Sequence, residues 1–273
     1  MNATAVRQAR TVIVGAAGRM GSQLLRLITE FPALQLHGAV DREGSAALGR
    51  DAGAYAGREP IGIPITASLA PLLETADLVI DFSHPESAAT NVAACVKGKA
   101  ALLMGTTGLS PDLESALADA GRSIALLVAA NTSLGVNVLL ELVRRTAEAL
   151  PPSYDIEIIE AHHRSKLDSP SGTALALGKA AAAARGLNLR EHAAYRPPGV
   201  GPARAERQIG MSSVRGGDVV GEHEVWFLGP GERVLLKHSA TDRAVFARGA
   251  LTAGAWLAGR APGRYTMSDV LSS

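Results

Sequence analysis

The residues best suited to chemistry lie in one run of the sequence, EAHHRSKLDSPSGT at residues 160–173. Two histidines, an arginine and a lysine fall within residues 162–166, and such a group of cations suits a substrate with more than one carboxylate. Histidine titrates near neutrality and can pass a proton, and a lysine can donate one where neighbouring cations or burial weaken its hold on it. His162 and Lys166 are therefore candidate proton-transfer residues, the alternative for each being a solvated surface charge.

The end of the same run has the pattern of a helix start. Pro170 precedes Ser171, Gly172 and Thr173, and good helix formers follow. The exposed N–H groups of such a helix end can hold a substrate carboxylate. Ordinary capping by Ser171 is the alternative, and one serine can serve both purposes.

The histidines also raise the question of a metal site. Adjacent residues on a strand point to opposite faces, so His162 and His163 form a poor chelating pair. The single cysteine and the acidic residues offer no standard ligand spacing. We therefore expect no metal.

A second pattern, GAAGRMG at residues 15–21, follows an apolar run and precedes a helical pattern. Glycines there let the backbone approach a phosphate closely, and the helix end offers N–H groups and a positive dipole. Asp41, twenty residues after Gly21, ends the next predicted strand, where a carboxylate can accept hydrogen bonds from ribose hydroxyls. This order favours a dinucleotide site, with NADH or NADPH as cofactor, over a simple tight turn. The residues concerned are the glycines Gly15, Gly18 and Gly21, the acid Asp41 and the neighbouring cations Arg19 and Arg42.

Two of these cations keep alternatives open. Arg42 can stack on adenine or meet a 2′-phosphate, so the choice between NADH and NADPH is not decided. Arg19 is either a phosphate contact or a solvated charge in the first helical turn.

Two polar segments follow later predicted strands. Ligands of open parallel sheets bind beyond the carboxyl ends of the strands, where these segments are expected to lie. The amide of Asn131 suits the carboxamide of a nicotinamide. The residues concerned are Gly105, Thr106 and Thr107, then Ala129, Ala130, Asn131 and Thr132.

These residues need a scaffold, and the hydrophobic pattern predicts one. Strand-like and helix-like segments alternate over the first half of the chain, as in a doubly wound parallel sheet. Strands are expected at residues 11–14, 34–40, 78–82, 101–104 and 124–128, with helices at 19–29, 86–97 and 111–121. After Leu150 a second unit begins, with strands at 154–160, 208–215, 219–228 and 233–238 and helices at 172–185 and 244–258.

The composition excludes several other classes of protein. The 27 Lys and Arg against 26 Asp and Glu give a net charge of +1, so no global charge attracts nucleic acid or an anionic membrane. The chain of 273 residues, 47% of them hydrophobic, is too apolar for disorder, and no apolar stretch is long enough to predict a membrane span or a secretory signal. The single Cys95 cannot form an intrachain disulfide, which fits a cytoplasmic protein.

The chain resembles the 4-hydroxy-tetrahydrodipicolinate reductase family, also called the dihydrodipicolinate reductases, over essentially its whole length. The matching motifs are GAAGRMG at residues 15–21, DR at 41–42, DFSHPE at 81–86, GTTG at 105–108, AANTSLGVN at 129–137 and EAHHRSKLDSPSGTA at 160–174. His84 and Thr132 depart from residues that are common in the family.

The resemblance implies an oxidoreductase of lysine biosynthesis via diaminopimelate. The reaction reduces 4-hydroxy-tetrahydrodipicolinate, a dicarboxylate, to (S)-2,3,4,5-tetrahydrodipicolinate with NADH or NADPH. The implied fold is α/β: a Rossmann-type doubly wound parallel sheet at residues 1–132, a second α+β domain on a mixed sheet at 133–243, and a segment, 244–273, that returns to the first domain. The second domain would bind substrate and build a homotetramer.

The resemblance also implies roles for individual residues. His162 would be a proton donor or acceptor and Lys166 a proton donor. His163, Gly172 and Thr173 would contact the substrate. The coenzyme would contact Gly15, Ala16, Ala17, Gly18, Arg19, Met20, Asp41, Arg42, Gly105, Thr106, Thr107, Ala129, Ala130, Asn131 and Thr132. Independently of the resemblance, Arg243 follows the last predicted strand and is a further candidate for binding a carboxylate. We also expect hinges near Thr132 and Thr241, because coenzyme and substrate would be held by different domains.

Two rival functions remain at this point. One is an NAD(P)H reductase of another anionic imine or aldehyde, which would keep the glycine turn but not the run at residues 160–173. The other is a non-catalytic pyridine-nucleotide sensor, which would have no use for His162 and Lys166.

Overall fold

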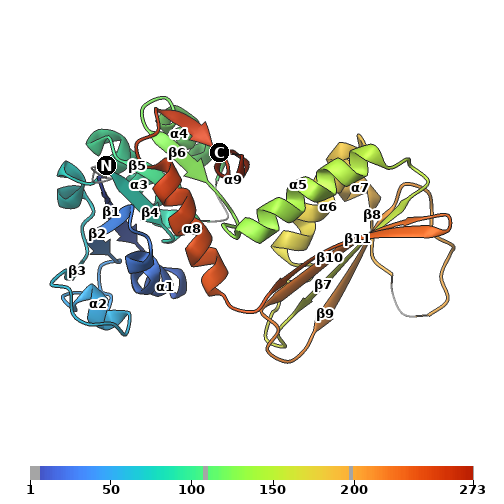
Figure 1. Ribbon diagram of the computed structural model, residues 1–273, viewed down its shortest axis with the longest axis horizontal. Helices are drawn as coiled ribbons and strands as arrows, with labels where there is room; N and C mark the ends of the chain where they lie inside the picture. Colours follow the sequence, from blue (N-terminus) through green and yellow to red (C-terminus); the bar gives the residue numbers. More distant parts are fainter. Residues whose placement is uncertain (1–6, 107–109, 197–198, 273) are drawn as a thin grey trace, which may run out of the picture. The chain divides into compact units, whose positions relative to one another are not determined.

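The computed structural model describes residues 7–106, 110–196 and 199–272, and Figure 1 traces the chain. The chain folds as two compact units. The first contains residues up to Leu134 and resumes at Ala244, whereas the second spans Gly135–Arg243. Among the described residues, the first unit is built on a sheet of seven strands and the second on a sheet of five.

The sheet of the first unit is parallel, and the chain runs outward from its centre in both directions. Strand β1 (Ala9–Val14) pairs with β2 (Leu34–Val40) on one side and with β4 (Leu78–Asp81) on the other. The order reverses between β1 and β4, and doubly wound sheets bind their ligands at such a point. This confirms the predicted Rossmann-type sheet. The outer strands are β3 (Ile65–Thr66) beyond β2, then β5 (Ala101–Met104), β6 (Ala125–Val128) and β12 (Gly263–Tyr265) beyond β4.

Side-chain alternation along these strands divides the interior of the first unit into two cores. Ile13 and Ile80 pack toward α1 and α8, and Val12 and Val79 pack on the opposite face, toward α3 and α4. Both faces of the sheet are therefore covered by helices (Figure 1). The helices are α1 (Arg19–Leu27), α2 (Ala52–Tyr55), α3 (Pro85–Gly98), α4 (Pro111–Ala120), α8 (Ala244–Leu257) and α9 (Met267–Leu271), with 3-10 turns at Ile28–Glu30 and Ala70–Glu74.

The second unit has a mixed sheet with helices over one face. Its order is β11-β10-β7-β9-β8, in which β7 pairs antiparallel with β10 and parallel with β9. Apolar residues of α5 and α6 pack on one face of this sheet and form a third core. The elements are α5 (Leu134–Ala149), β7 (Asp155–His162), α6 (Gly172–Ala184), α7 (Leu189–His192), β8 (Ala193–Ala194), β9 (Ile209–Arg215), β10 (Gly221–Gly229) and β11 (Glu232–Ala240).

Alternation along β7 determines which of its polar residues are buried. Ile156 and Ile158 belong to the core, and Glu160 and His162 continue the same face, so all four side chains are buried. The polar pair thus lies at the end of an apolar row, beneath α6.

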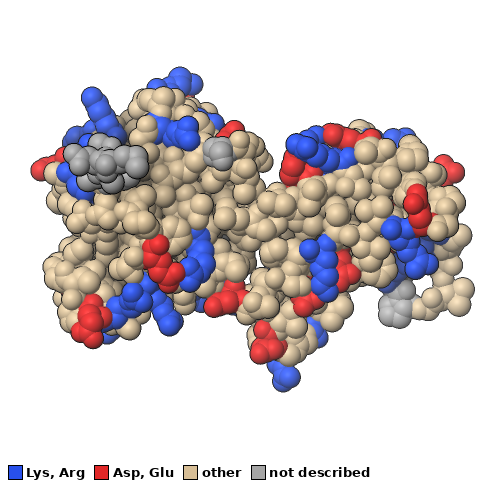
Figure 2. Space-filling model, in the orientation of Figure 1, with Lys and Arg blue, Asp and Glu red and all other residues tan. Residues whose placement is uncertain are grey.

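On the face shown in Figure 2, basic and acidic side chains are mixed, in keeping with the net charge of +1. Within the described residues, no helix combines the length and the apolar character needed to cross a membrane.

Small residues let α8 lie close to the rest of the first unit. A Cβ at position 249 would stand 1.8 Å from the carbonyl oxygen of Thr132, and one at Gly254 would stand 3.0 Å from a terminal methyl of Ile80. The backbone near Thr132 has no room to move away, because its hydroxyl donates to the carbonyl of Phe246 at 2.7 Å.

We expect Gly249→Ala to lower the free energy of unfolding by about 1–3 kcal/mol, since a methyl group there collides with backbone. Gly254→Ala in the same helix is the matched control. Its methyl meets a flexible side chain and gains helix propensity, so we expect little or no loss. Urea unfolding of both variants measures the difference, and equal stability of the two would contradict the packing argument.

Candidate active site

A cavity of about 830 Å³ opens in the first unit at the carboxyl ends of β1, β2 and β4. Its lining includes Gly15, Ala17, Gly18, Asp41 and Arg42, five of the residues predicted to bind a dinucleotide. Of the other residues in that segment, Ala16 is fully buried beneath the turn, and Arg19 and Met20 begin α1. The cavity thus lies at the switch point where the sequence places the coenzyme.

The glycine turn has the backbone form that a phosphate site needs. Gly15 has a φ of +78°, and a Cβ there would stand 2.8 Å from the carbonyl oxygen of Phe82. A Cβ on Gly21 would stand 2.1 Å from the oxygen of Gly15. Gly18 begins α1 without a side-chain cap, so main-chain N–H groups face the opening. The residues present therefore fit a dinucleotide.

The far end of the cavity carries one acid among cations. Asp41 accepts a hydrogen bond from the hydroxyl of Ser45 at 2.7 Å. Arg42 and Arg50 line the same wall, and the guanidinium of Arg50 lies 4.9 Å from the ring centre of Tyr55. Arg50 and Tyr55 were missed by sequence reasoning, because they come from a segment without a recognisable motif.

The loop after β4 is fixed by a fully buried carboxylate. Asp81 accepts from the N–H of Ser83 at 2.7 Å and from the amide of Asn91 at 2.9 Å. Phe82, Ser83, His84 and Asn91 all line the cavity. The first three of these residues belong to the DFSHPE run, whose position at the end of a predicted strand is the sequence signal for this wall of the cavity.

The remaining predicted coenzyme contacts follow β5 and β6. Thr106 donates to the carbonyl of Ser83 at 3.1 Å, and the side chain of Asn131 accepts from the N–H of Ser133 at 2.9 Å. The buried Thr132 side chain anchors the start of α8, so its hydroxyl has a structural partner. Gly105 contacts the Phe82 ring, and Ala129 and Ala130 continue from β6; Thr107 lies outside the described residues.

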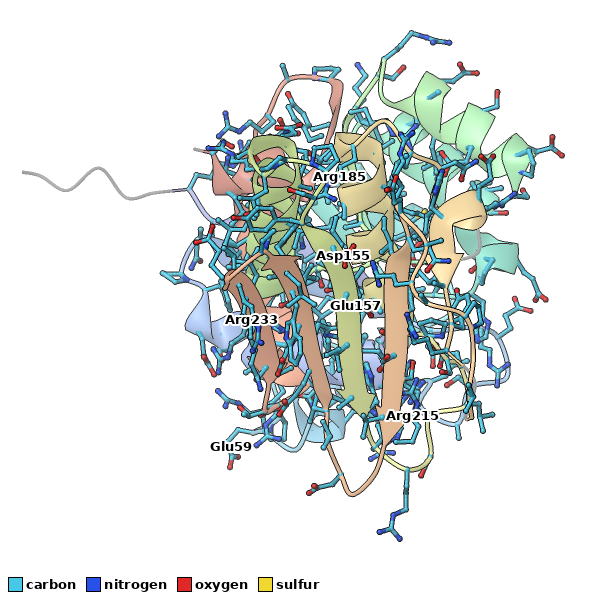
Figure 3. The ribbon with its side chains drawn as sticks, turned by 90° about the vertical axis from the view of Figure 1, so that its right-hand side faces the viewer. Glu59, Asp155, Glu157, Arg185, Arg215 and Arg233 are labelled. Carbon is cyan, nitrogen blue, oxygen red and sulfur yellow. The ribbon has the colours of Figure 1, made fainter. Side chains whose placement is uncertain are left out.

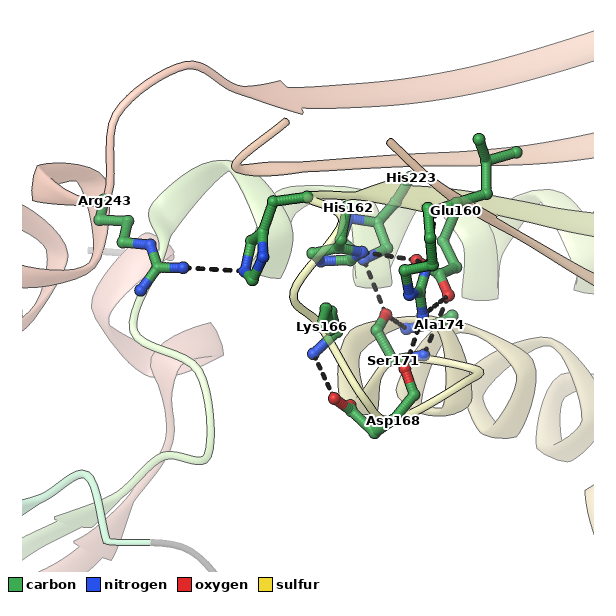
Figure 4. Close-up of polar contacts among 11 residues, drawn as sticks. Glu160, His162, Lys166, Asp168, Ser171, Ala174, His223 and Arg243 are labelled. Atoms are coloured by element: carbon green, nitrogen blue, oxygen red, sulfur yellow. Dashed lines mark hydrogen bonds and ion pairs between the residues drawn. The ribbon is translucent and has the colours of Figure 1, made fainter. Parts of the chain in front are cut away.

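In the second unit, the end of β7 carries a buried acid and a buried histidine (Figure 4). His162 is 9% exposed, and its Nδ1 lies 2.5 Å from Oε2 of Glu160. Burial lowers the pKa of His162 most strongly, whereas the neighbouring Glu160 carboxylate opposes this. A histidine whose pKa is set by these two opposing effects can gain and lose a proton in the physiological pH range.

The loop that follows carries the other two predicted cations. The ammonium of Lys166 lies 2.8 Å from Asp168, with its side chain 21% exposed. His163 has a different partner from His162: its Nε2 lies 3.0 Å from the guanidinium of Arg243, which Figure 4 labels. The structure thus places Arg243 beside the predicted substrate residues.

Helix α6 begins beside this cluster. The Ser171 hydroxyl accepts from the N–H of Ala174 at 3.2 Å, as a helix cap does. It also lies 3.1 Å from Nε2 of His223, a buried residue that sequence reasoning missed. Burial, the largest cause, lowers the pKa of His223 to about 4, so this neighbour stays uncharged at neutral pH.

The first residues of α6 leave an open approach. A Cβ on Gly172 would meet nothing within 4 Å. Gly172 and Thr173 therefore stand at a helix start that an anion can reach, within the same unit as His163, Lys166 and Arg243. Among the described residues, no group of three or more His, Cys, Asp or Glu is arranged to hold a metal ion.

Comparison with known proteins gives a consistent result. The family models for the N-terminus and the C-terminus of dihydrodipicolinate reductase match residues 9–132 and 135–271. The 4-hydroxy-tetrahydrodipicolinate reductase of Anaeromyxobacter dehalogenans (strain 2CP-C) is 48% identical, covering 96% of this chain and 97% of its own length. The relative of that name from Syntrophotalea carbinolica (strain DSM 2380 / NBRC 103641 / GraBd1) is 43% identical over 96% of this chain and 98% of its own.

Solved structures show the same fold. A dipicolinate-bound dihydrodipicolinate reductase from Paenisporosarcina sp. TG-14 has a TM-score of 0.76 at 22% identity, covering 95% of this chain and 97% of its own. An amine dehydrogenase from Mycobacterium smegmatis shares the architecture with a TM-score of 0.63 at 13% identity, over 96% of each chain. Because the two family models together span almost the whole sequence, this chain belongs to the dihydrodipicolinate reductase family.

Proposed function

We propose that this chain reduces 4-hydroxy-tetrahydrodipicolinate to (S)-2,3,4,5-tetrahydrodipicolinate with NADH or NADPH, in lysine biosynthesis via diaminopimelate. The observation that carries the proposal is the second-unit cluster, in which the buried His162, Lys166 and the open start of α6 lie in one unit of a chain whose whole length matches the family. When bound, the coenzyme supplies a hydride. The protein supplies position, charge and protons.

For the coenzyme, the first unit provides the main chain of the glycine turn and the carboxylate of Asp41. The glycine turn has room for a pyrophosphate because no side chain fills it. Asp41 would accept from the ribose hydroxyls, and Arg42 would lie beside the same sugar. The other contacts proposed are Gly15, Ala16, Ala17, Gly18, Arg19, Met20, Gly105, Thr106, Thr107, Ala129, Ala130, Asn131 and Thr132.

For the substrate, the second unit provides cations and a helix start. His163, paired with Arg243, would bind one carboxylate, and the N–H groups at Gly172 and Thr173 would bind another. Two carboxylates held at separate points fix the ring in one orientation. The dicarboxylate nature of the substrate thus matches the arrangement of donors.

Loss of the substrate's hydroxyl as water leaves a conjugated imine, and its reduction moves electron density toward the ring nitrogen and the α-carbon. An acid must neutralise this charge as it develops. Lys166 has three N–H donors, of which the contact with Asp168 uses one, and His162 can donate from its ring. We assign proton donation to these two residues. Since coenzyme and substrate bind to different units, the hinges at Thr132 and Thr241 stay a prediction.

The assembly we propose is a homotetramer that works in the cytoplasm, as the family resemblance implies. The sheet face of the second unit opposite α5 and α6 carries apolar side chains among charged ones, with Val214 54% and Leu235 53% exposed. Figure 3 shows Asp155 and Glu157 on β7, two of the charged residues that alternate with its buried ones. A face of this kind suits contact between copies of the chain.

We expect Lys166→Ala to reduce kcat by about 10²–10⁴-fold, because the reaction loses a proton donor. Coupling to a dihydrodipicolinate synthase supplies the unstable substrate, and oxidation of the nicotinamide is followed by its absorbance. Leu167→Ala is the control, since that neighbouring side chain is 97% exposed. Unchanged turnover in Lys166→Ala, with Leu167→Ala also unchanged, removes Lys166 from its proposed role.

We expect Asp41→Ala to raise the Kd of NADH about 10-fold more than that of NADPH, because a ribose carrying a 2′-phosphate does not depend on that carboxylate. Titration calorimetry with each coenzyme measures the ratio. Glu43→Gln, two residues further on, is the charge-matched control. Equal weakening of both coenzymes would show that Asp41 makes no ribose contact.

A further inference from the structure

The buried carboxylate of Glu160 has no part in the mechanism above, yet both of its oxygens are hydrogen-bonded within the second-unit cluster. Its side chain is fully shielded from solvent. It lies two residues before His162 on β7, on the same face of the strand. An ionised group in such a place costs free energy unless it is well paired, so its partners carry information.

Arg215 is the principal partner. It ends β9, where it is the register neighbour of His162. Its two terminal nitrogens donate separately to the two oxygens of Glu160, at 2.8 and 2.7 Å. The N–H of Ser171 donates to Oε1 at 3.3 Å, and the ring of His162 meets Oε2 through Nδ1. Both carboxylate oxygens are therefore engaged (Figure 4).

These contacts fix the charge of Glu160. Burial is the largest single influence and raises the pKa of Glu160, but hydrogen bonds from Arg215, Ser213 and His162 outweigh it and lower the pKa to about 2. The group is therefore a carboxylate at neutral pH. A carboxylate only accepts hydrogen bonds, so Nδ1 of His162 must carry a hydrogen.

We propose that Glu160, held by Arg215, is a positioning residue that keeps a proton on Nδ1 of His162 and leaves Nε2 as the atom that gains and releases a proton toward substrate. The assignment of the tautomer follows from the contacts alone. Its importance for turnover rests on the function proposed above.

The surroundings of the His162 ring agree with this orientation. The ring of His223 lies edge-on to it, with 5.2 Å between centres and 74° between planes. A Cβ on Gly221 would stand 3.1 Å from Nε2, so the absence of a side chain there keeps this edge of the ring clear. The ring is thus held at Nδ1 and packed against His223, while Gly221 leaves space beside Nε2.

The same arginine also reaches the loop of the second proton donor. Arg215 donates to the carbonyl of Asp168 at 2.6 Å, and the side chain of Asp168 holds Lys166. One guanidinium therefore connects Glu160, and through it His162, with the segment that carries Lys166. Lys166 does not contact the Glu160 carboxylate in this network, but its positive charge lowers the pKa of His162.

The charges around His162 determine the sign of any pH effect. Burial, together with the cations Lys166 and Arg215, lowers its pKa, and Glu160 raises it. His223, from β10, is uncharged at neutral pH and adds little; its own cross-strand neighbour is His238 of β11. Removing the carboxylate of Glu160 therefore lowers the pKa of His162 and reduces the protonated fraction at a given pH.

The tautomer is measured directly on the wild-type protein. With ¹⁵N-labelled histidine, long-range ¹H–¹⁵N correlation spectra distinguish a ring protonated on Nδ1 from one protonated on Nε2. The His162 signals are identified by their loss in His162→Gln. We expect the Nδ1–H form at pH values where the ring is neutral, and a neutral ring carrying its hydrogen on Nε2 would overturn the proposal.

The pH profile of kcat/KM provides the second measurement. We expect Glu160→Gln to move the basic limb about one unit toward lower pH and to reduce kcat, and Glu160→Asp to return the limb toward its wild-type position. Glu141→Gln is the control. Glu141, on α5, is also hydrogen-bonded to two arginines, which lower its pKa to about 2, but it lies 37% exposed on the surface.

The outcomes separate a positioning role from a structural one. A purely structural Glu160 would lower the amplitude of the Glu160→Gln profile without moving its limb, and that result overturns the proposal. If Glu160→Gln fails to fold because Arg215 has lost its partner, the tautomer measured on the wild-type protein tests the proposal by itself. If the wild type does not turn over the dicarboxylate, the proposed function fails, whereas the tautomer measurement needs no substrate and is unaffected.

Discussion

The two-residue repeat of an extended strand governs the chemistry of the second unit. Along β7, Ile156 and Ile158 fill the core, and the same repeat carries Glu160 and His162 inward at the end of the strand. The next residue, His163, leaves the strand and meets Arg243 instead. The burial of His162, its tautomer and the different contacts of His162 and His163 all depend on this alternation.

The constraint on the first unit is different, because its backbone must come close to an anion. At Gly15 and Gly21 a methyl group would collide with main-chain atoms, so these positions exclude every other residue on packing grounds. The uncapped start of α1 and the switch point between β1 and β4 then place N–H groups at the cavity. In the proposed function both units offer main-chain N–H groups to an anion, and the second unit adds the side chains of His163 and Arg243.

The sequence predicted the long elements well. Each expected strand and helix begins and ends within two residues of its observed bounds. The longer elements leave a clear amphipathic period, and the four-residue strands β4, β5 and β6 are recognisable as short runs of mainly apolar residues. The exception is α5, a helix of 16 residues for which the sequence analysis gave no bounds, and the short elements α2, β3, α7, β8, β12 and α9 were missed. Strands β3, β8 and β12 are only two or three residues long and exist because a neighbouring strand offers hydrogen bonds, which no local pattern records.

The functional residues also divide into those that a local sequence pattern reveals and those that only the fold brings together. Motif residues such as Gly15 and Asp41 were recognisable because their chemistry is local. Arg215 and His223 come 55 and 52 residues after their partners Glu160 and Ser171, so only the sheet register brings them together. Thr132 makes another contact of this kind: besides being a proposed coenzyme residue, it anchors α8 through its buried hydroxyl, across 114 residues of sequence.

The passage of the chain through its two units has a consequence for synthesis on the ribosome. The second unit is an insertion between β6 and α8, so the polypeptide leaves the first unit at Leu134 and returns only at Ala244. Until then the nascent sheet lacks β12, and the core around Ile13 and Leu103 is open on the side that α8 covers. The inserted unit is continuous in sequence, so it can fold completely before α8 and β12 of the first unit have been synthesised.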